Sequence, residues 1–181
     1  MKKVKMDDMN RLSGEEYRSA SKIDLVIVLD NVRSMMNTGS IFRTADAFRV
    51  RKIFLCGITA TPPHREIEKT ALGATESVAW EYHEDCGALL KSLKDAGVTI
   101  AAVEQLDDSI MVDNWKHNHA NPLALVFGNE VSGVSDESLK HCDYGLEIPQ
   151  HGTKHSLNIS VSAGIVIWEA YNRLKHQIGV Y

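Results

Sequence analysis

The stretch LALVFGNEVSGVSDE, residues 123–137, places an apolar run directly before a polar turn that contains two glycines. The run LALVF is apolar at every position, which is typical of a parallel strand covered on both faces of its sheet. The turn has the GxxxxG spacing of a phosphate-binding loop, but Val134 stands where that loop requires lysine. The stretch therefore predicts a buried strand ending in a turn whose backbone amides can face a ligand, and it argues against a P-loop.

The same pattern recurs along the chain. Further apolar runs lie at 25–29, 52–56, 77–82, 98–103 and 145–148. Helical patterns separate them, at 38–48, 65–72, 86–97, 136–142 and about 157–176. Alternation of this kind predicts an α/β fold with a mostly parallel sheet of about six strands, flanked by helices.

The chain is expected to form one main domain. Its 181 residues are 44% hydrophobic and 24% charged, as in an ordinary globular protein. Residues 1–22 are polar and are interpreted as an N-terminal arm or helix packed against a domain at 23–181. The stretch 104–122 shows the least periodicity and is expected to be a loop.

Several classes of protein lack their sequence signals. Cys56, Cys86 and Cys142 form no CxxC pair, so neither a disulfide framework nor a zinc site is indicated, and buried thiols in a reducing cytoplasm are expected. His151 and His155 have no third metal ligand near them. No apolar run approaches the roughly 20 residues that span a bilayer, and no apolar stretch follows the basic N-terminus as in a signal peptide. We therefore expect a cytoplasmic protein with no membrane segment and no metal.

The charge distribution is uneven. The net charge of −4 argues against a nucleic-acid binder, but residues 1–52 hold 11 Lys and Arg against 7 Asp and Glu. The remaining residues hold 9 against 17. Such asymmetry permits a basic face on an acidic body.

Ligands of open parallel sheets gather beyond the carboxyl ends of the strands, so the loops after 25–29, 123–127 and 145–148 are the expected ligand-binding loops. In the first, NTGSIFRTADAF (37–48) is interpreted as the start of a helix, with Arg43 within about its first turn. A cation there costs a few tenths of a kcal/mol. Two interpretations stay open: Arg43 pairs with Asp46 on the solvent face, or Arg43 and the helix amides converge on a phosphate.

The other two loops carry further polar groups. Glu130 follows the strand at 123–127, either exposed to solvent or part of a site. In EIPQHGTKHSLNISVSAGIVIWEAY (147–171), Ser156 can cap a helix with Asn158 in its first turn. A stripe of small residues then allows close helix packing or a dimer face; it comprises Ser156, Ser160, Ala163 and Gly164. No GxGxxG, GxSxG or HExxH motif is present.

The three stretches together, in this order, resemble the SpoU/TrmH group of SPOUT RNA methyltransferases. The first motif of that family is Asn-x-Gly followed by Arg, here NTGSIFR (37–43). The second is a strand ending in Phe/Tyr-Gly-x-Glu, here LVFGNEVSGVS (125–135). The third is Ile-Pro near Gly, then Ser-Leu-Asn-x-Ser, here IPQHGTKHSLNISVSAG (148–164). The matches around them extend from about residue 25 to 171.

The resemblance implies a SPOUT fold with a C-terminal trefoil knot, a homodimer, and S-adenosyl-L-methionine held mainly by backbone. The implied reaction is methyl transfer to a ribose 2′-hydroxyl in an RNA substrate, tRNA or rRNA. Two alternatives stay open: a catalytically inactive RNA-binding module of the same fold, and a small-molecule or nucleotide enzyme on a generic parallel sheet. The acidic bulk and the short termini motivate the first of these.

The resemblance also assigns roles to residues. The implied catalytic or positioning groups are Arg43, Asn37, Glu130, Ser156 and Asn158. The implied cofactor-binding residues are Gly128, Ile148, Leu157, Asn129 and Pro149. Because an arginine pKa lies above about 12, we favour a fixed cation that orients phosphate and lowers the effective pKa of the hydroxyl over a general base.

Two positions depart from the family pattern. Arg49 stands where glycine commonly follows the first helix, and Gln150 where an apolar residue is frequent. A non-glycine residue in a left-handed cap costs roughly 1 kcal/mol, so the helix is expected to end differently. Arg49, Arg51 and Lys52 can instead enlarge an RNA-facing basic edge.

Overall fold

The computed structural model describes residues 1, 3, 11–117 and 121–180. Within these residues, seven strands form one sheet in the order β3-β2-β1-β6-β4-β7-β5, and every neighbouring pair is parallel. The strands are β1 (Ile23–Asp30), β2 (Val50–Cys56), β3 (Trp80–His83), β4 (Thr99–Val103), β5 (Ile110–Met111), β6 (Leu123–Phe127) and β7 (Tyr144–Glu147). The expected α/β class with a parallel sheet is confirmed.

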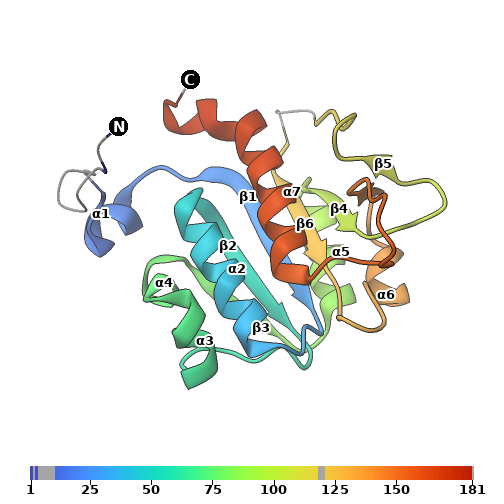
Figure 1. Ribbon diagram of the computed structural model, residues 1–181, viewed down its shortest axis with the longest axis horizontal. Helices are drawn as coiled ribbons and strands as arrows, with labels where there is room; N and C mark the ends of the chain where they lie inside the picture. Colours follow the sequence, from blue (N-terminus) through green and yellow to red (C-terminus); the bar gives the residue numbers. More distant parts are fainter. Residues whose placement is uncertain (2, 4–10, 118–120, 181) are drawn as a thin grey trace.

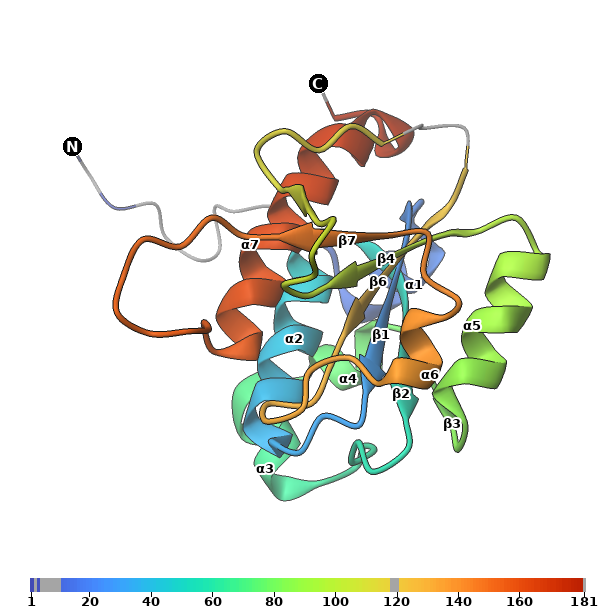
Figure 2. The ribbon, with the colours of Figure 1, turned by 90° about the vertical axis from the view of Figure 1, so that its right-hand side faces the viewer.

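Helices cover both faces of the sheet (Figure 1, Figure 2). One layer holds α2 (Met35–Ala47), α3 (Arg65–Ala71), α4 (Ala74–Ser77) and α7 (Ile159–Leu174), which continues into the 3₁₀ helix η2 (Lys175–Ile178). The opposite layer holds α5 (Cys86–Asp95) and α6 (Asp136–Leu139). Within the first layer, α2 and α7 lie side by side.

The continuous apolar strands follow from this sandwich. Along β1, Leu25, Ile27 and Leu29 pack into the core beneath α2 and α7. Val28 faces the second core, beneath α5. A strand buried on both faces needs apolar residues at every position, which explains why the runs do not alternate.

Two strand predictions needed correction. The run 77–82 is divided: α4 takes up Ser77, and β3 begins only at Trp80. The edge strand β5 was not expected, because a two-residue strand leaves no periodic signal. Strand order alone does not establish how one loop threads another, so the trefoil knot stays a prediction.

The first motif helix begins earlier than its sequence indicated. Ser34 is the N-cap of α2, and its hydroxyl accepts the N–H of Asn37. Residues 37–40 therefore lie inside the helix, and Arg43 lies in its third turn, not its first. The dipole penalty that singled out Arg43 does not apply, because the effect fades within the first turn.

Arg49 adopts the conformation that glycine would, with φ of +52°. Its N–H donates to Asp46 O (3.1 Å), and its carbonyl accepts the N–H of Ile23 at the start of β1 (3.0 Å). The expectation that α2 ends differently because it lacks glycine was wrong. The left-handed turn is retained, and these two hydrogen bonds offset the strain of a side chain there.

The last helix also begins at a different residue. Asn158 is the N-cap of α7, and its Oδ1 accepts the N–H of Ser160 (2.9 Å). Ser156 lies outside the helix, so it is neither the cap nor part of a helical stripe.

The N-terminal part contains α1 (Gly14–Ser19), closed by a capping box between Ser13 and Glu16. Tyr17 is buried against the domain, and Arg18 donates to the carbonyl of Glu76 (3.5 Å). Part of the predicted arm, residues 2 and 4–10, lies outside the described residues. The division at residue 22 stays a prediction.

The three cysteines carry free thiols; Cys56 and Cys86 are buried, and Cys142 is half-buried. Burial raises the pKa of Cys142 to about 12. None of the described helices is both long enough and apolar enough to pass through a membrane.

Candidate functional site

The strands β1, β6, β4 and β7 are neighbours and parallel, so the loops after them meet at one edge of the sheet. A cavity of about 420 Å³ lies at this edge. Apolar and polar groups line it: Val103, Glu104, Gln105, Phe127, Gly128, Asn129, Glu130, Val131, Gly133, Leu146, Glu147, Ile148, Gln150, His155, Ser156, Leu157, Asn158, Ile159 and Ser162. A volume of this size suits a nucleoside-sized ligand.

The turn at 128–134 is fixed by its own hydrogen bonds. Asn129 and Gly133 exchange both backbone N–H···O bonds, each 2.9 Å long. The side-chain oxygen of Asn129 accepts the N–H of Val131 (2.9 Å) and of Ser132 (3.2 Å), and its amide donates to the carbonyl of Asn31 (2.8 Å). The predicted cofactor residue Asn129 lines the cavity, but its polar atoms are already used to shape the turn.

Glycine and two carboxylates hold this turn against the sheet. A Cβ on Gly128 would lie 2.1 Å from the backbone of Gly133 and of Val134. Glu104 accepts the N–H of Val134 (3.1 Å). At the far end of the turn, Asp30 accepts both the N–H (3.0 Å) and the hydroxyl (2.7 Å) of Ser135. The protein's own hydrogen bonds therefore hold the turn in this shape.

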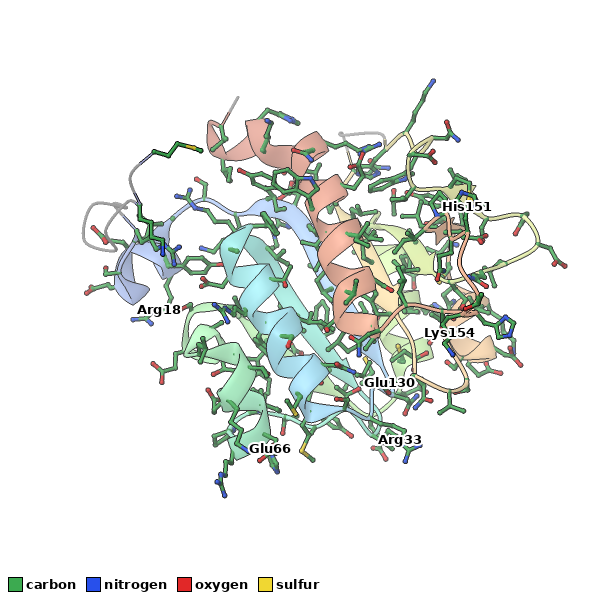
Figure 3. The ribbon with its side chains drawn as sticks, in the orientation of Figure 1. Arg18, Arg33, Glu66, Glu130, His151 and Lys154 are labelled. Atoms are coloured by element: carbon green, nitrogen blue, oxygen red, sulfur yellow. The ribbon has the colours of Figure 1, made fainter. Side chains whose placement is uncertain are left out.

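Glu130 connects this turn to the loop before α2. One carboxylate oxygen accepts the N–H of Arg33 (2.9 Å), and the other accepts the N–H of Ser34 (3.0 Å) and the amide of Asn37 (3.2 Å). Figure 3 shows Glu130 and Arg33 as neighbours. Burial alone raises the pKa of Glu130, but these donors and its own N–H more than offset burial and lower the pKa below its usual value.

Asn37 joins all three motif stretches. Its Nδ2 donates to Glu130, and its Oδ1 accepts a hydrogen bond from Nδ2 of Asn158 (3.3 Å). Asn158 in turn caps α7. The structure thus brings together three polar groups that are distant in the sequence.

The segment 149–158 closes the cavity on another side and is far more open. Residues 151–158 are all exposed, and His151 and Lys154 project from the ribbon (Figure 3). Apart from the bonds of Asn158, this segment has one hydrogen bond to another loop among the described residues. Gln105 Nε2 donates to the carbonyl of His155 (3.2 Å).

Seven of the ten predicted site residues line the cavity, and three do not. The lining residues are Glu130, Ser156, Asn158, Gly128, Asn129, Ile148 and Leu157. Asn37 lies behind Glu130 as its partner. Pro149 and Arg43 are outside the lining. The individual roles stay predictions.

Arg43 is exposed on α2, on the same side as the exposed Met36, and Ile41 packs into the core on the other side. The pair with Asp46 is not among the ion pairs of the described residues, and no cation–carboxylate contact involves Arg43 there. The solvent-face interpretation of Arg43 therefore lacks its partner.

Sequence reasoning missed the loop after β4. Glu104 and Gln105 line the cavity and hydrogen-bond to the walls on either side. The rule that ligands lie beyond the carboxyl ends of parallel strands applied to 98–103 as well and would have found them. The stretch 104–122 has no periodic pattern, so the sequence predicts a loop there and gives no sign of which of its residues face the cavity.

The basic residues at the start of β2 lie at the opposite edge of the sheet. Arg51 pairs with Asp24, and Lys52 pairs with Glu81 (2.6 Å). Both lie at the amino end of β2, whereas the cavity lies at the carboxyl ends of the strands, and neither residue lines it. The described residues hold no cluster of three or more potential metal ligands.

Comparisons with known proteins agree with this geometry. The model of the SpoU rRNA Methylase family matches residues 24–168. The chain is 32% identical over 167 residues to a tRNA (guanosine(18)-2′-O)-methyltransferase of Thermus thermophilus, covering 92% of this chain and 84% of that protein. It is 32% identical over 149 residues to the 23S rRNA (guanosine-2′-O-)-methyltransferase RlmB of Neisseria meningitidis serogroup B, covering 82% of this chain but only 58% of that protein.

Solved structures show the same fold. The TrmH/SpoU tRNA modifying enzyme of A. aeolicus superposes with a TM-score of 0.78 at 29% identity, over 91% of this chain and 81% of that one. The AdoMet-bound rRNA methyltransferase of Sinorhizobium meliloti gives 0.77 at 28% identity, over 91% and 62%.

The parallel sheet that carries the turn and the junction of three motifs thus has the fold of the SpoU/TrmH class of RNA-modifying enzymes. Within that class, the chain belongs to the SpoU rRNA methylase family.

Proposed function

We propose that this protein transfers a methyl group from S-adenosyl-L-methionine to a ribose 2′-hydroxyl of tRNA or rRNA, in the cytoplasm. The observation that carries the proposal is the hydrogen-bonded chain Glu130–Asn37–Asn158, which joins the three family motifs beside the cavity. Relatives that share about a third of the sequence are named as 2′-O-methyltransferases of tRNA or of rRNA, which supports the reaction and leaves both RNA classes in place.

The cavity fits the cofactor in size and in chemistry. Partly exposed apolar side chains such as Val103, Ile148 and Leu157 offer a surface for an adenine ring. Polar groups such as Gln105, Gln150 and Ser162 offer hydrogen-bond partners for the ribose and the amino-acid part. S-adenosyl-L-methionine, when bound, supplies a methyl group activated by its positive sulfonium.

The ribose needs help from the protein, because a hydroxyl is a weak nucleophile. As the 2′-oxygen takes the methyl group, its proton passes to solvent water, and a fixed positive charge nearby stabilises the developing negative charge on the oxygen. Arg43 is the candidate for this charge. It carries no carboxylate partner among the described residues, so its guanidinium is free to contact an RNA phosphate.

We also propose a homodimer, which brings Arg43 to a cavity. Val161, Ile165 and Trp168 are 49%, 38% and 49% exposed and follow one another at i, i+4 and i+7 along α7. In the proposed dimer, a twofold partner docks on this stripe and brings its own copy of α2 toward the cavity, because α7 begins at the cavity and α2 lies beside α7.

Labelled cofactor and bulk RNA test the reaction. Wild-type protein is incubated with S-adenosylmethionine carrying a labelled methyl group, and the modified nucleotide is mapped by mass spectrometry. A 2′-O-methylated nucleotide in tRNA or rRNA supports the proposal and identifies the substrate. RNA binding without transfer favours the inactive binding module, and a methylated base or protein contradicts the reaction.

Variants of Arg43 test its role. Arg43→Ala is expected to lower methyl transfer by at least about a thousandfold while cofactor binding persists, and Arg43→Lys to retain little activity because lysine lacks the planar fork. Methylation by Arg43→Ala at close to the wild-type rate would exclude the role.

Mixing two inactive variants tests the dimer. If Arg43 serves the partner's cavity, a mixture of Arg43→Ala and Asn158→Ala chains recovers about one quarter of wild-type activity. Half of the random dimers then carry one intact site of two. If each chain uses its own Arg43, the mixture stays inactive.

A further inference from the structure

We propose that carboxylates on the cavity wall make the protein prefer the cationic methyl donor over its neutral product, with Glu104 and Glu147 as the residues that determine this preference. This inference rests on the proposed function, because it concerns ligands of the same cavity. It goes beyond that function by assigning two residues that no family motif includes.

The charges of the lining are one-sided. Glu104, Glu130 and Glu147 line the cavity, and the described residues of the lining include no lysine or arginine. The one imidazole among them belongs to His155, which lies on the open segment and is exposed. A net negative wall attracts a cation, and partial burial keeps the attraction from being screened as it would be in bulk water.

The donor and the product differ by one charge. S-adenosylmethionine carries a sulfonium, an ammonium and a carboxylate, so it has a net positive charge. S-adenosylhomocysteine has a neutral thioether in place of the sulfonium and is neutral overall. A negative wall therefore adds attraction for the donor that the product cannot use.

The three carboxylates are committed to different degrees. Glu130 accepts three hydrogen bonds that hold the loop before α2, so it is tied to the architecture. Glu104 accepts the N–H of Gln105 (3.0 Å) and of Val134 (3.1 Å), one on each oxygen. Each of its oxygens keeps a further lone pair for a ligand. Neutral N–H donors orient a carboxylate but do not cancel its charge.

Glu147 is the least constrained of the three. It is the last residue of β7 and half-buried, and only its backbone pairs with neighbours among the described residues: its carbonyl accepts the N–H of Val112 (2.8 Å). Its carboxylate has no ion pair in that part of the chain. Partial burial of this carboxylate costs desolvation free energy, which a cation bound beside it would offset.

Binding calorimetry tests the preference without any turnover. The probes are S-adenosylhomocysteine and sinefungin, a stable analogue with an amine at the sulfonium position. We expect wild-type protein to bind sinefungin about tenfold more tightly than S-adenosylhomocysteine, or about 1.4 kcal/mol. Glu147→Gln and Glu104→Gln, which remove the charge and keep the shape, are each expected to lower this ratio by about threefold.

Two controls separate the outcomes. Glu15→Gln on α1, at the far end of the molecule (Figure 1), removes the same charge and should leave the ratio unchanged. Thermal unfolding verifies each fold. Because Glu104→Gln can loosen the turn through Val134, Glu147→Gln decides if the two disagree.

A wild-type ratio near one overturns the preference. A ratio that Glu147→Gln leaves unchanged overturns the role of Glu147 in it. The cofactor assignment stands in both cases. Failure of both ligands to bind the wild-type protein overturns the cofactor assignment and the preference with it.

Discussion

The turn at 128–134 and the segment at 149–158 both line the cavity, but they are held in different ways. In the turn, Asn129 alone makes five hydrogen bonds. Glu104 holds Val134 from the loop after β4, Glu130 connects the turn to the loop before α2, and Asp30 at the end of β1 holds Ser135 directly after the turn. In the segment, eight consecutive residues are exposed, and one bond to His155 crosses to another loop.

The difference shows how this site divides its tasks. A wall that is formed in advance costs no ordering when a ligand binds, so it can position the reacting groups. A wall with few contacts must be ordered by whatever covers it: the cofactor, the RNA or a second subunit.

The largest expected effect comes from adding a methyl group to the turn, and the same change in the open segment serves as its control. Gly128→Ala places a Cβ against the backbone of Gly133 and Val134, so the turn must move. We expect a loss of about 3 kcal/mol in the free energy of unfolding, with cofactor binding reduced at least tenfold. Gly152→Ala is the matched control, because no heavy atom lies within 4 Å of its Cβ, and it should be neutral or slightly stabilising.

Urea unfolding and calorimetry with S-adenosylhomocysteine measure both effects. Equal losses from the two alanines would mean that the open segment is as tightly packed as the turn.

The sequence predicts the strands of the sheet and the residues of the site to different extents. The strand β6 was located to the residue and β1 to within two residues, because burial on both faces demands uninterrupted apolar runs. The family motifs then identified most of the cavity lining. The edge strand β5 left no pattern to find, since its two residues need only pair with β7.

The starting residues of the helices were predicted less well, because several capping residues lie close together in the sequence. Ser34, Asn37 and Ser156 are all good capping residues, and the sequence does not tell which one the tertiary structure uses. The structure uses Ser34, which puts Arg43 in the third turn of α2. Glu104 was not singled out because its partner Val134 lies 30 residues away and no local sequence pattern links the two residues.

A second, smaller effect is expected from the carboxylate that links the turn to α2. Glu130→Gln removes the negative charge and leaves one acceptor oxygen for three N–H donors. We expect a loss of about 1–2 kcal/mol at pH 7. The variant stays folded, because the rest of the turn is held by Asn129 and Glu104.

The pH dependence gives this prediction a distinctive sign. Because the pKa of Glu130 is lower in the folded state, its contribution to stability is present above the unfolded value of 4.5. That contribution is lost as the pH falls through the folded pKa. Urea unfolding from pH 7 to pH 3 should therefore show the gap between wild type and Glu130→Gln closing at low pH. A gap that is constant over this range would exclude the carboxylate charge as its cause.

Amide hydrogen exchange compares the walls within one molecule. Without ligand, peptides covering 128–134 should exchange slowly, and peptides covering 149–158 rapidly. Saturating S-adenosylhomocysteine should slow exchange in 149–158 by about tenfold and change the turn little, because only the open wall gains order on binding. Rapid exchange in the unliganded turn would contradict its preformed state.

The smallest expected effect is at Asn158, where the open segment becomes helix α7 and meets the preformed wall. Its Oδ1 caps the helix through Ser160, and its Nδ2 donates to Asn37. Asn158→Ala removes both bonds and should cost about 1 kcal/mol. Asn158→Asp keeps the cap and adds a charge that suits the helix N-terminus, so its stability should equal or exceed that of wild type.

The two variants of Asn158 should nevertheless agree in activity. Aspartate at position 158 cannot donate to Asn37, and its charge lies near the negative Glu130, which is the next group in the hydrogen-bonded chain. The junction of the motifs is therefore broken in both variants. Steady-state methylation measured beside thermal unfolding separates the two roles. If Asn158→Asp is both stable and fully active, Asn158 serves the helix alone, and the link between the walls has no part in catalysis.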